Sequence, residues 1–459
     1  MYDEWMGLRK RLLFRALPDQ FGAEMAAIRD GWINDFRSAT EHRRKQLIAI
    51  AKELTIDIKS YLSAWHLLKR GGPLTKAVLD QDFNDNMMLL KKWGASDEIL
   101  YIENEVDSLE KSSLIRLSEM SDEGRINTRW GNDYATGLTH ALRRGAVLVT
   151  TNPPLINIAR KSHPEVWDPV RDKLKAEHPD YDTEQLCSLM TMHVVLANCR
   201  EIRPIYETTG GEYGYVSLQV NPKNYTDANS MALEAETLYV QLKDQLEGTP
   251  NVVFKVPATK AGLEVVRRLT IQGIGVNVTV NFAVAQEMAF GDIIEKGKAK
   301  VSFLTLMSGR LDDPIKNELI SLGAEDAAEV AKWGGIAVAR RVYDILYRQK
   351  KYKKSFLLQA SLRGPWHIDE LVTDEEKRIF ITVFPDIAGE YDSLPRDIRP
   401  RMKDNVPTDV LEKLNRSNIF RQAYQVDGLE VEEFDNYLPV DVTLQAFGKA
   451  YDEFLEYLR

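Results

Sequence analysis

The sequence predicts a parallel (β/α)8 barrel with added helices at both ends of the chain. Between residues 126 and 385, short apolar runs typical of strands alternate with longer stretches of helical apolar spacing. Eight such runs fit into this region, which has the length typical of one barrel. A doubly wound open sheet is the structural alternative. No GxGxxG motif follows any predicted strand, so a dinucleotide site has no support.

Turn residues separate the predicted strands from the helices. Gly145 and Gly273 each end a helix, and Asn152-Pro153-Pro154 stops the second strand. The stretch 155–209 is helical and largely charged, which indicates an insertion. The predicted strands are residues 126–132, 147–151, 215–220, 252–256, 276–280, 301–306, 355–361 and 379–384. Helices predicted between them include residues 134–144, 228–246, 283–296 and 324–349.

The two ends of the chain are predicted to be mostly helical. We assign residues 1–125 to a helical N-terminal extension, 126–385 to the catalytic barrel and 386–459 to C-terminal helices that pack on it. Gly71-Gly72-Pro73 divides the N-terminal extension in two. The terminal helices are also the surface through which copies of the chain would associate into a homo-oligomer.

Composition argues against several classes of function. The net charge of -9 argues against a nucleic-acid partner. No apolar run reaches the roughly 18 residues that a transmembrane helix needs, so we expect no membrane partner. The N-terminus lacks the apolar segment of a signal peptide. Cys187 and Cys199 are the only cysteines and form no CxxC motif, which favours a cytoplasmic protein without structural zinc.

The fourth predicted strand has a lysine in its interior. Lys255 stands between Phe254 and Val256 in a short apolar run. Lysine is almost never fully buried without a partner. A desolvated lysine has a lowered pKa and can act as a neutral amine nucleophile, which forms a Schiff base with a carbonyl compound. The alternative is a lysine on an exposed strand edge.

Polar side chains on three adjacent strands are predicted to point into the barrel. Side chains of a strand alternate between its two faces, and the apolar neighbours of each polar residue are expected to pack on the surrounding helices. By this rule Gln219, Lys255, Asn277 and Thr279 converge inside the barrel. Any one of them is tolerated in a half-buried strand, but four unpaired polar groups in a core are costly. The set therefore indicates a functional site.

Further polar residues end the neighbouring strands. Asp133 ends the first strand and is a candidate proton acceptor, and Asn152 ends the second and is a candidate for orienting a hydroxyl group. The alternative for both is a helix cap. Arg310 follows the sixth strand, and Ser361 and Arg363 end the seventh, a combination that suits a phosphate or a similar anion. The alternative for each arginine is a surface ion pair.

Five segments between residue 130 and about residue 385 resemble the transaldolase family, in the order in which the family has them. Together they are far more specific than any one alone. The resemblance implies a (β/α)8 barrel and a class I aldolase that needs neither a metal nor a cofactor. The segments are TTNPPLI (150–156), the active-site motif VVFKVPATKAGL (252–263), GVNVTV (275–280), SGRLDD (308–313) and QASLR (359–363).

The resemblance also implies roles for these residues. Lys255 would form a Schiff base with a ketose phosphate, and Thr279 would help to hold a catalytic water. The proton acceptor of the family aligns with Asp133 or with its neighbour Asn132. Substrate binding would be the task of Asn152, Asn277, Thr305, Arg310, Ser361 and Arg363.

One residue departs from the transaldolase pattern. The family strand has the pattern S-x-E-V, in which the glutamate works through water, whereas residues 217–220 are SLQV. Gln219 can position a water but cannot exchange a proton. The related fructose-6-phosphate aldolases have glutamine here. The resemblance thus implies transfer of a dihydroxyacetone unit, as in the pentose phosphate pathway, or cleavage that releases free dihydroxyacetone. A sugar-phosphate-binding protein without turnover is the third interpretation.

Overall fold

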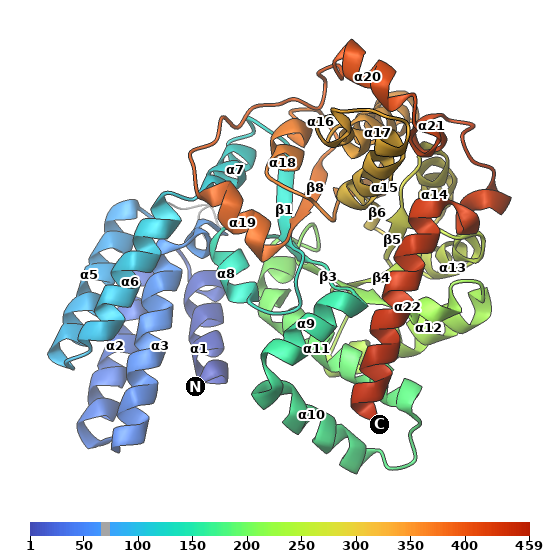
Figure 1. Ribbon diagram of the computed structural model, residues 1–459. Helices are drawn as coiled ribbons and strands as arrows, with labels where there is room; N and C mark the ends of the chain where they lie inside the picture. Colours follow the sequence, from blue (N-terminus) through green and yellow to red (C-terminus); the bar gives the residue numbers. More distant parts are fainter. Residues whose placement is uncertain (66–73) are drawn as a thin grey trace.

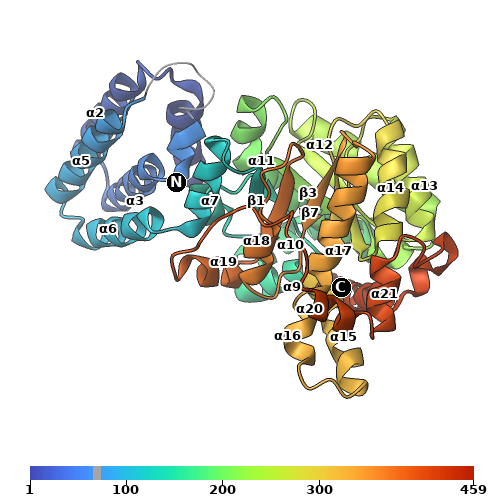
Figure 2. The same cartoon turned by 90° about the horizontal axis from the view of Figure 1, so that it is seen from above.

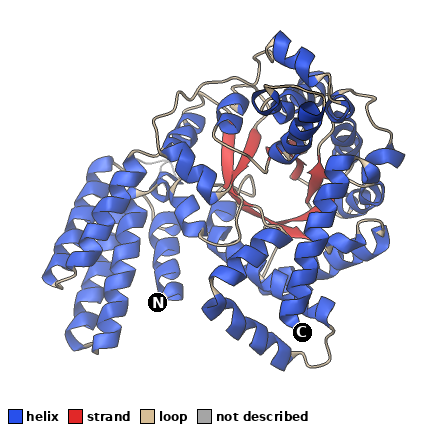
Figure 3. Ribbon diagram, viewed as in Figure 1, coloured by secondary structure: helices blue, strands red, loops and turns tan. Residues whose placement is uncertain are grey.

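The computed structural model describes residues 1–65 and 74–459, and it contains the predicted barrel. Eight parallel strands close into a single sheet in the order of the sequence (Figure 3). Each strand lies within two residues of its predicted limits. The predicted break at residues 71–73 lies outside the described residues. The strands are β1 (Thr128–Asn132), β2 (Leu148–Val149), β3 (Tyr215–Gln219), β4 (Val252–Pro257), β5 (Val276–Asn281), β6 (Ser302–Leu306), β7 (Ser355–Gln359) and β8 (Ile379–Val383).

Helices surround the barrel between successive strands (Figure 3). The first is shorter than predicted, because Gly137 adopts a left-handed conformation and the helix begins only after it. The predicted insertion at 155–209 forms three helices, and the predicted helix 324–349 is divided into three parts. The elements are α8 (Leu138–Arg143), α9 (Pro153–Ser162), α10 (Pro164–Glu177), α11 (Thr183–Thr208), η3 (Pro222–Asn224), α12 (Ala228–Gln245), α13 (Lys260–Ile271), α14 (Val284–Lys296), α15 (Ser308–Ser321), α16 (Ala327–Ala331), α17 (Gly334–Tyr343), η4 (Asp344–Gln349) and α18 (Trp366–Leu371).

The N-terminal helices form a separate group beside the barrel (Figure 2). Side-chain oxygens of Thr40, Thr75 and Ser112 accept hydrogen bonds from backbone N–H groups in the first turns of α3, α5 and α7, which fixes where these helices begin. Their apolar faces pack on one another. The elements are α1 (Tyr2–Arg9), η1 (Lys10–Arg15), α2 (Phe21–Ser38), α3 (Glu41–Lys59), η2 (Tyr61–Ser63), α5 (Lys76–Lys92), α6 (Ser96–Glu110) and α7 (Ser113–Asp122).

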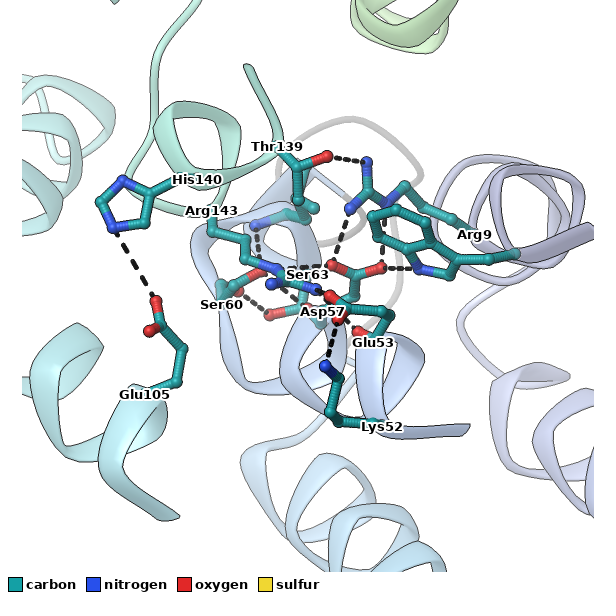
Figure 4. A network of polar contacts seen from close by, with 12 residues as sticks. Arg9, Lys52, Glu53, Asp57, Ser60, Ser63, Glu105, Thr139, His140 and Arg143 are labelled. Carbon is teal, nitrogen blue, oxygen red and sulfur yellow. Dashed lines mark hydrogen bonds and ion pairs between the residues drawn. The ribbon is translucent and has the colours of Figure 1, made fainter. Parts of the chain in front are cut away.

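A buried carboxylate attaches this helical group to the barrel (Figure 4). Asp57 of α3 is fully buried between Arg9 of α1 and Arg143 of α8. Both oxygens of Asp57 accept hydrogen bonds from Arg9 at 2.9 Å, and Oδ1 also accepts one from Arg143 at 2.8 Å. Trp5 Nε1 donates a further bond at 2.8 Å. Because the charges are paired and hydrogen-bonded, their burial is tolerated and α1, α3 and α8 are held together.

Aromatic side chains fill the end of the barrel at which the strands begin. Phe303, Phe356 and Phe380 come from β6, β7 and β8, and the ring centroids of Phe303 and Phe380 are 5.3 Å apart. Arg129 of β1 donates a 2.9 Å hydrogen bond to the hydroxyl group of Tyr61 in η2, so the N-terminal region also closes this end. Side chains of β1, β6, β7, β8 and η2 therefore occupy this end of the barrel.

The last of the C-terminal helices lies at the opposite end. The last helix, α22, runs across it and contacts α9, α11, α15 and β5 (Figure 1). Its apolar residues join those of α9 and α11 in a second apolar cluster outside the barrel. None of the described helices is long and apolar enough to span a membrane. The elements are α19 (Pro385–Asp392), α20 (Thr408–Leu414), α21 (Asn418–Tyr424), η5 (Val431–Asn436) and α22 (Leu438–Leu458).

Candidate active site

Lys255 lies inside the barrel, level with two other predicted site residues. In the strand pairing, its Cα is opposite that of Gln219 on β3 and that of Asn277 on β5. Partners in a parallel pair point to the same side of the sheet, so the three side chains share the barrel interior. The Lys255 side chain is almost completely buried, and its Nζ donates a 2.7 Å hydrogen bond to the carbonyl oxygen of Thr151.

The surroundings of Lys255 lower its pKa to about 8. Burial is the largest cause, because it disfavours the charged ammonium, and the positive charge of Arg310 acts in the same direction. The carboxyl group of Asp133 opposes both effects. With a pKa of about 8, roughly a tenth of the amine is neutral at pH 7, far more than for an ordinary lysine. Burial therefore makes Lys255 a better candidate for a nucleophile than an ordinary lysine.

Hydrogen bonds fix the orientation of the Asn277 amide. Its Nδ2 donates to Ser217 Oγ on β3 at 2.8 Å, and its Oδ1 accepts from Thr305 Oγ1 on β6. All three side chains are buried, so their polar groups satisfy one another. Thr305, which was predicted to bind substrate, donates the hydrogen bond to Oδ1 and so helps to hold Asn277. Ser217 had no predicted role, although its even spacing from Gln219 places it on the same face of β3.

The strand register distinguishes Asp133 from Asn132. Asn132 shares its side of β1 with Trp130, which packs outward and donates a hydrogen bond to the carbonyl oxygen of Arg144. The Asn132 amide bonds backbone oxygens of the loop that follows. The side chain of Asp133 follows on the opposite face of β1. Its Oδ1 accepts a 2.7 Å hydrogen bond from Thr150 Oγ1. Its charge acts on Lys255, so the geometry favours Asp133 as the carboxyl group of the site.

Three further predicted residues, Asn152, Gln219 and Thr279, differ from one another in their hydrogen bonding. Asn152 caps α9, because its Oδ1 accepts a 3.0 Å hydrogen bond from Leu155 N. The Oε1 atom of Gln219 is buried without a hydrogen-bond partner among the described residues. Thr279 Oγ1 lies 3.7 Å from Met307 Sδ, which is a weak acceptor. Gln219 and Thr279 therefore retain hydrogen-bonding capacity for a water or a ligand.

Backbone strain lies beside this cluster. Val280, the residue after Thr279, has a φ of 52°, and the register between β5 and β6 shifts between Val278 and Asn281. A β-branched residue rarely adopts this conformation, which costs on the order of 1–3 kcal/mol. Such strain gathers at functional sites. It could not be predicted, since valine at position 280 otherwise continues the alternating pattern.

The predicted anion-binding residues lie together where α15 begins and β7 ends. The backbones approach closely, because a Cβ atom at Gly309 would come within 2.2 Å of the Ser361 carbonyl oxygen. Arg310 lies over the ring of Phe447 in α22, 5.4 Å from its centroid. Arg363 donates to Asp313 Oδ2 from Nη2 at 2.7 Å and from Nε at 3.2 Å. Arg363 is thus paired with an acid, whereas Arg310 packs against α22.

A buried histidine supports the predicted anion-binding residues, and nothing in the sequence singles it out. His367 of α18 is completely buried, with Nε2 2.9 Å from Asp312 Oδ2 and Nδ1 accepting a hydrogen bond from Arg363 N. Asp312 Oδ1 in turn accepts a 2.7 Å bond from Gly335 N. The acceptor role of Nδ1 places the ring proton on Nε2, so Asp312 accepts it. This chain of bonds holds the Arg363 loop against α15.

The residues near Lys255 suit acid–base and carbonyl chemistry. They supply a carboxyl group, amides and hydroxyl groups from five different strands or strand ends. Within residues 1–65 and 74–459, no group of three or more His, Cys, Asp or Glu side chains is arranged to hold a metal ion. Cys187 and Cys199 are buried as free thiols.

Comparison with known proteins identifies the family of this site. The family model described as Transaldolase/Fructose-6-phosphate aldolase matches residues 138–437, which is well over half of the chain. The chain belongs to this family. The matched segment includes the lysine strand β4 and the predicted anion-binding residues Arg310, Ser361 and Arg363. It begins after Asp133 and ends before α22.

Individual members of the transaldolase family are similar to this chain, at low sequence identity. Transaldolase 1 of Streptomyces avermitilis is 28% identical over 257 residues, which are 54% of this chain and 65% of that protein. The transaldolase of Thiobacillus denitrificans is 28% identical over 42% of this chain and 55% of its own length. The transaldolase of Neisseria meningitidis is 34% identical over 36% of this chain and 44% of its own length. The matched part of the chain therefore spans between 44% and 65% of the length of these relatives.

Proposed function

We propose that the chain catalyses a class I aldol reaction on a ketose phosphate through a Schiff base at Lys255. The observation that carries this proposal is the buried amine with its lowered pKa, level with Gln219 and Asn277 and close to the carboxyl group of Asp133. Membership of the transaldolase family, whose named relatives are transaldolases, supports it.

The first half of the reaction forms the imine. The neutral Lys255 amine attacks the C2 carbonyl carbon of the ketose, and the resulting carbinolamine loses water to give a protonated imine. Gln219 and Thr279 would hold the water that carries protons in this step, since both retain hydrogen-bonding capacity. Asn277, held by Ser217 and Thr305, would donate a preoriented amide proton to a substrate hydroxyl group.

The second half breaks the C3–C4 bond. Asp133 accepts the proton of the C4 hydroxyl group, the C4 carbon becomes the carbonyl carbon of the leaving aldose, and the bonding electrons move into the imine. The three-carbon enamine stays on Lys255. It then either adds to the carbonyl carbon of an acceptor aldose, or takes up a proton at C3 and is hydrolysed to free dihydroxyacetone. The hydrolysis consumes the water that imine formation released.

Simple cleavage is the second candidate, because Gln219 stands where the related fructose-6-phosphate aldolases also have glutamine. A carboxyl group at this position would exchange protons with the water directly, which glutamine cannot do. The two activities are separated by supplying fructose 6-phosphate with and without erythrose 4-phosphate. Transfer predicts a seven-carbon ketose phosphate and little free dihydroxyacetone. Free dihydroxyacetone at equal rates in both reactions would rule out an obligate transferase.

The rate of imine formation is expected to rise with pH and to level off above about 8. The nucleophile is the deprotonated amine, so its fraction increases tenfold per pH unit until the pH passes the lowered pKa of Lys255, about 8. An ordinary lysine would continue to gain reactivity up to about pH 10. The measurement is the initial rate of adduct formation with dihydroxyacetone and cyanoborohydride across this range. A plateau only above pH 10 would contradict the effect of burial.

A Gln219→Glu variant is expected to raise the transfer rate about tenfold, because it restores a proton-exchanging group beside Lys255. The matched control is Gln359→Glu, which changes another buried glutamine at the end of β7, four strands away in the barrel. Initial transfer rates with erythrose 4-phosphate measure the effect. Unchanged or lower transfer in the Gln219 variant would show that the missing carboxyl group does not limit this enzyme.

A further inference from the structure

A pocket of about 330 Å³ lies at the end of the barrel where the strands begin. The segments that lead into β3, β4, β5 and β6 form it, together with α11 and α12. Its volume suits a complete small molecule. The predicted anion-binding residues lie at the other end, where β6 and β7 finish, so both places can be occupied at once. The polar side chains that line the pocket are Tyr206, Tyr215, Tyr239, Thr249, Lys298 and Lys300.

Lys298 and Lys300 give this pocket a positive charge. Both belong to the short loop between α14 and β6, and both are exposed. Neither forms an ion pair within residues 1–65 and 74–459. No aspartate or glutamate lines the pocket. Two unpaired like charges on one short loop do not favour folding, but they attract an anionic ligand.

Acidic side chains near the pocket do not neutralise this charge. Glu207 accepts a 3.2 Å hydrogen bond from Arg203, with which it forms an ion pair. Glu295 accepts hydrogen bonds from three backbone N–H groups at the start of β7. Asp244 and Glu247, at the end of α12 and in the turn after it, are exposed and lie outside the lining. A ligand in the pocket therefore meets the charge of the two lysines.

Backbone contacts hold the lysine loop in place. Lys298 N and Ala299 N both donate to the carbonyl oxygen of Thr270, at 2.7 Å and 3.1 Å. The segments before β5 and β6 approach closely, because a Cβ atom at Gly275 would come within 2.7 Å of the Val301 carbonyl oxygen. The rim of the pocket is thus ordered without a ligand, which lowers the entropic cost of binding.

Three tyrosines supply a wall that is both apolar and hydroxylated. The ring centroids of Tyr206 and Tyr215 are 5.4 Å apart in an edge-to-face arrangement. The Tyr215 hydroxyl group donates a 2.7 Å hydrogen bond to the Gly211 carbonyl oxygen, which fixes this ring. Tyr239 is half-buried on α12, and Thr249 adds a further hydroxyl group. Ring surface and hydroxyl groups together suit a ring-bearing molecule with several oxygen atoms.

We propose that this pocket binds a small phosphate monoester that carries a sugar ring, which is the chemistry shared by sugar phosphates and nucleoside monophosphates. The phosphate group carries a charge of about −1.5 to −2 at pH 7 and only accepts hydrogen bonds. Lys298 and Lys300 each supply up to three donors for it, and the sugar ring lies against the tyrosines. The site is separate from Lys255, so this inference does not depend on the proposed reaction.

Calorimetric titration with adenosine 5′-monophosphate and with ribose 5-phosphate tests this inference. The full chain is used with an Arg310→Gln change, which weakens the predicted anion-binding residues of the active site. Both esters are expected to bind, and adenosine, which lacks the phosphate, at least about tenfold more weakly than its monophosphate. A clearly tighter nucleotide would identify a nucleoside monophosphate as the ligand, and equal affinities a sugar phosphate. Adenosine binding as tightly as its monophosphate, or no binding of either ester at millimolar concentrations, would overturn the inference.

Variants of the loop locate the binding. Lys298→Gln combined with Lys300→Gln should weaken both esters about tenfold or more, because two charged donors are lost. Lys296→Gln, at an exposed lysine just outside the lining, is the control and should leave the affinities unchanged. All three lysines are exposed, so the fold is expected to persist in each variant. Affinities that the double variant leaves unchanged would place the ligand elsewhere and contradict the assignment.

Discussion

Replacing Lys255 with methionine is expected to abolish turnover, with a loss of at least about four orders of magnitude in kcat/KM. Methionine keeps an unbranched chain of similar length in the buried position but removes the amine that forms the imine. Because the buried ammonium and its cost disappear, the fold should be retained or become more stable. The measurements are steady-state kinetics and chemical denaturation on the same preparation.

The control for this variant is Lys377→Met. Burial also lowers the pKa of Lys377 to about 8, but this lysine lies over the ring of Phe356 at the end of the barrel where the strands begin. Its replacement should leave turnover within a few-fold of wild type. Full activity in the Lys255 variant, or an equal loss in both variants, would disprove the role assigned to Lys255.

Replacing Asp57 with alanine is expected to destabilise the protein by about 3–5 kcal/mol. Alanine leaves Arg9 and Arg143 buried without the carboxylate that both contact, and uncompensated buried charge is the reason for the large effect (Figure 4). The free energy of unfolding from urea titration is the measurement. Glu41→Ala, at the exposed beginning of the same helix, is the control and should change little, because exposed ion pairs contribute little to stability.

The contribution of Asp57 is also expected to depend on pH. Burial alone would raise the pKa of Asp57, but the charges of Arg9 and Arg143 outweigh it and hold the pKa below its ordinary value. Its stabilisation is therefore present above about pH 4, the ordinary pKa of an aspartate, and is lost as the pH falls through the lowered value. The difference between wild type and the Asp57 variant should be constant near neutral pH and narrow only below about pH 4. A difference that disappears near pH 7 would contradict this account.

The barrel could be predicted from the sequence because the residue patterns of its strands and helices are local and periodic. Apolar runs of strand length recur between helical segments, and parallel strands in chain order bring their ends together. For the same reason Lys255, Gln219 and Asn277 were expected on one face, and the strand register places them level with one another. The break in periodicity at Gly137 and the division of the helix predicted at 324–349 were not visible in the pattern.

Interactions between distant residues could not be predicted. Asp57 is 48 residues from Arg9 and 86 from Arg143, and no local pattern indicates which acids meet which arginines. The pairing of Arg363 with Asp313, the support from His367 and the chain of bonds from Ser217 to Thr305 depend on the closed barrel in the same way. The position of α22 over the barrel follows from tertiary packing alone.

The most direct test of the central claim is to map the lysine that forms an imine. The protein is incubated with dihydroxyacetone, which lacks the anionic group and so does not depend on the arginine site, and is reduced with borohydride and digested. We predict a stable adduct of one reduced three-carbon unit on the peptide that contains Lys255, and none in the Lys255→Met variant. An adduct on another lysine, or none on any peptide, would contradict a Schiff-base mechanism at Lys255.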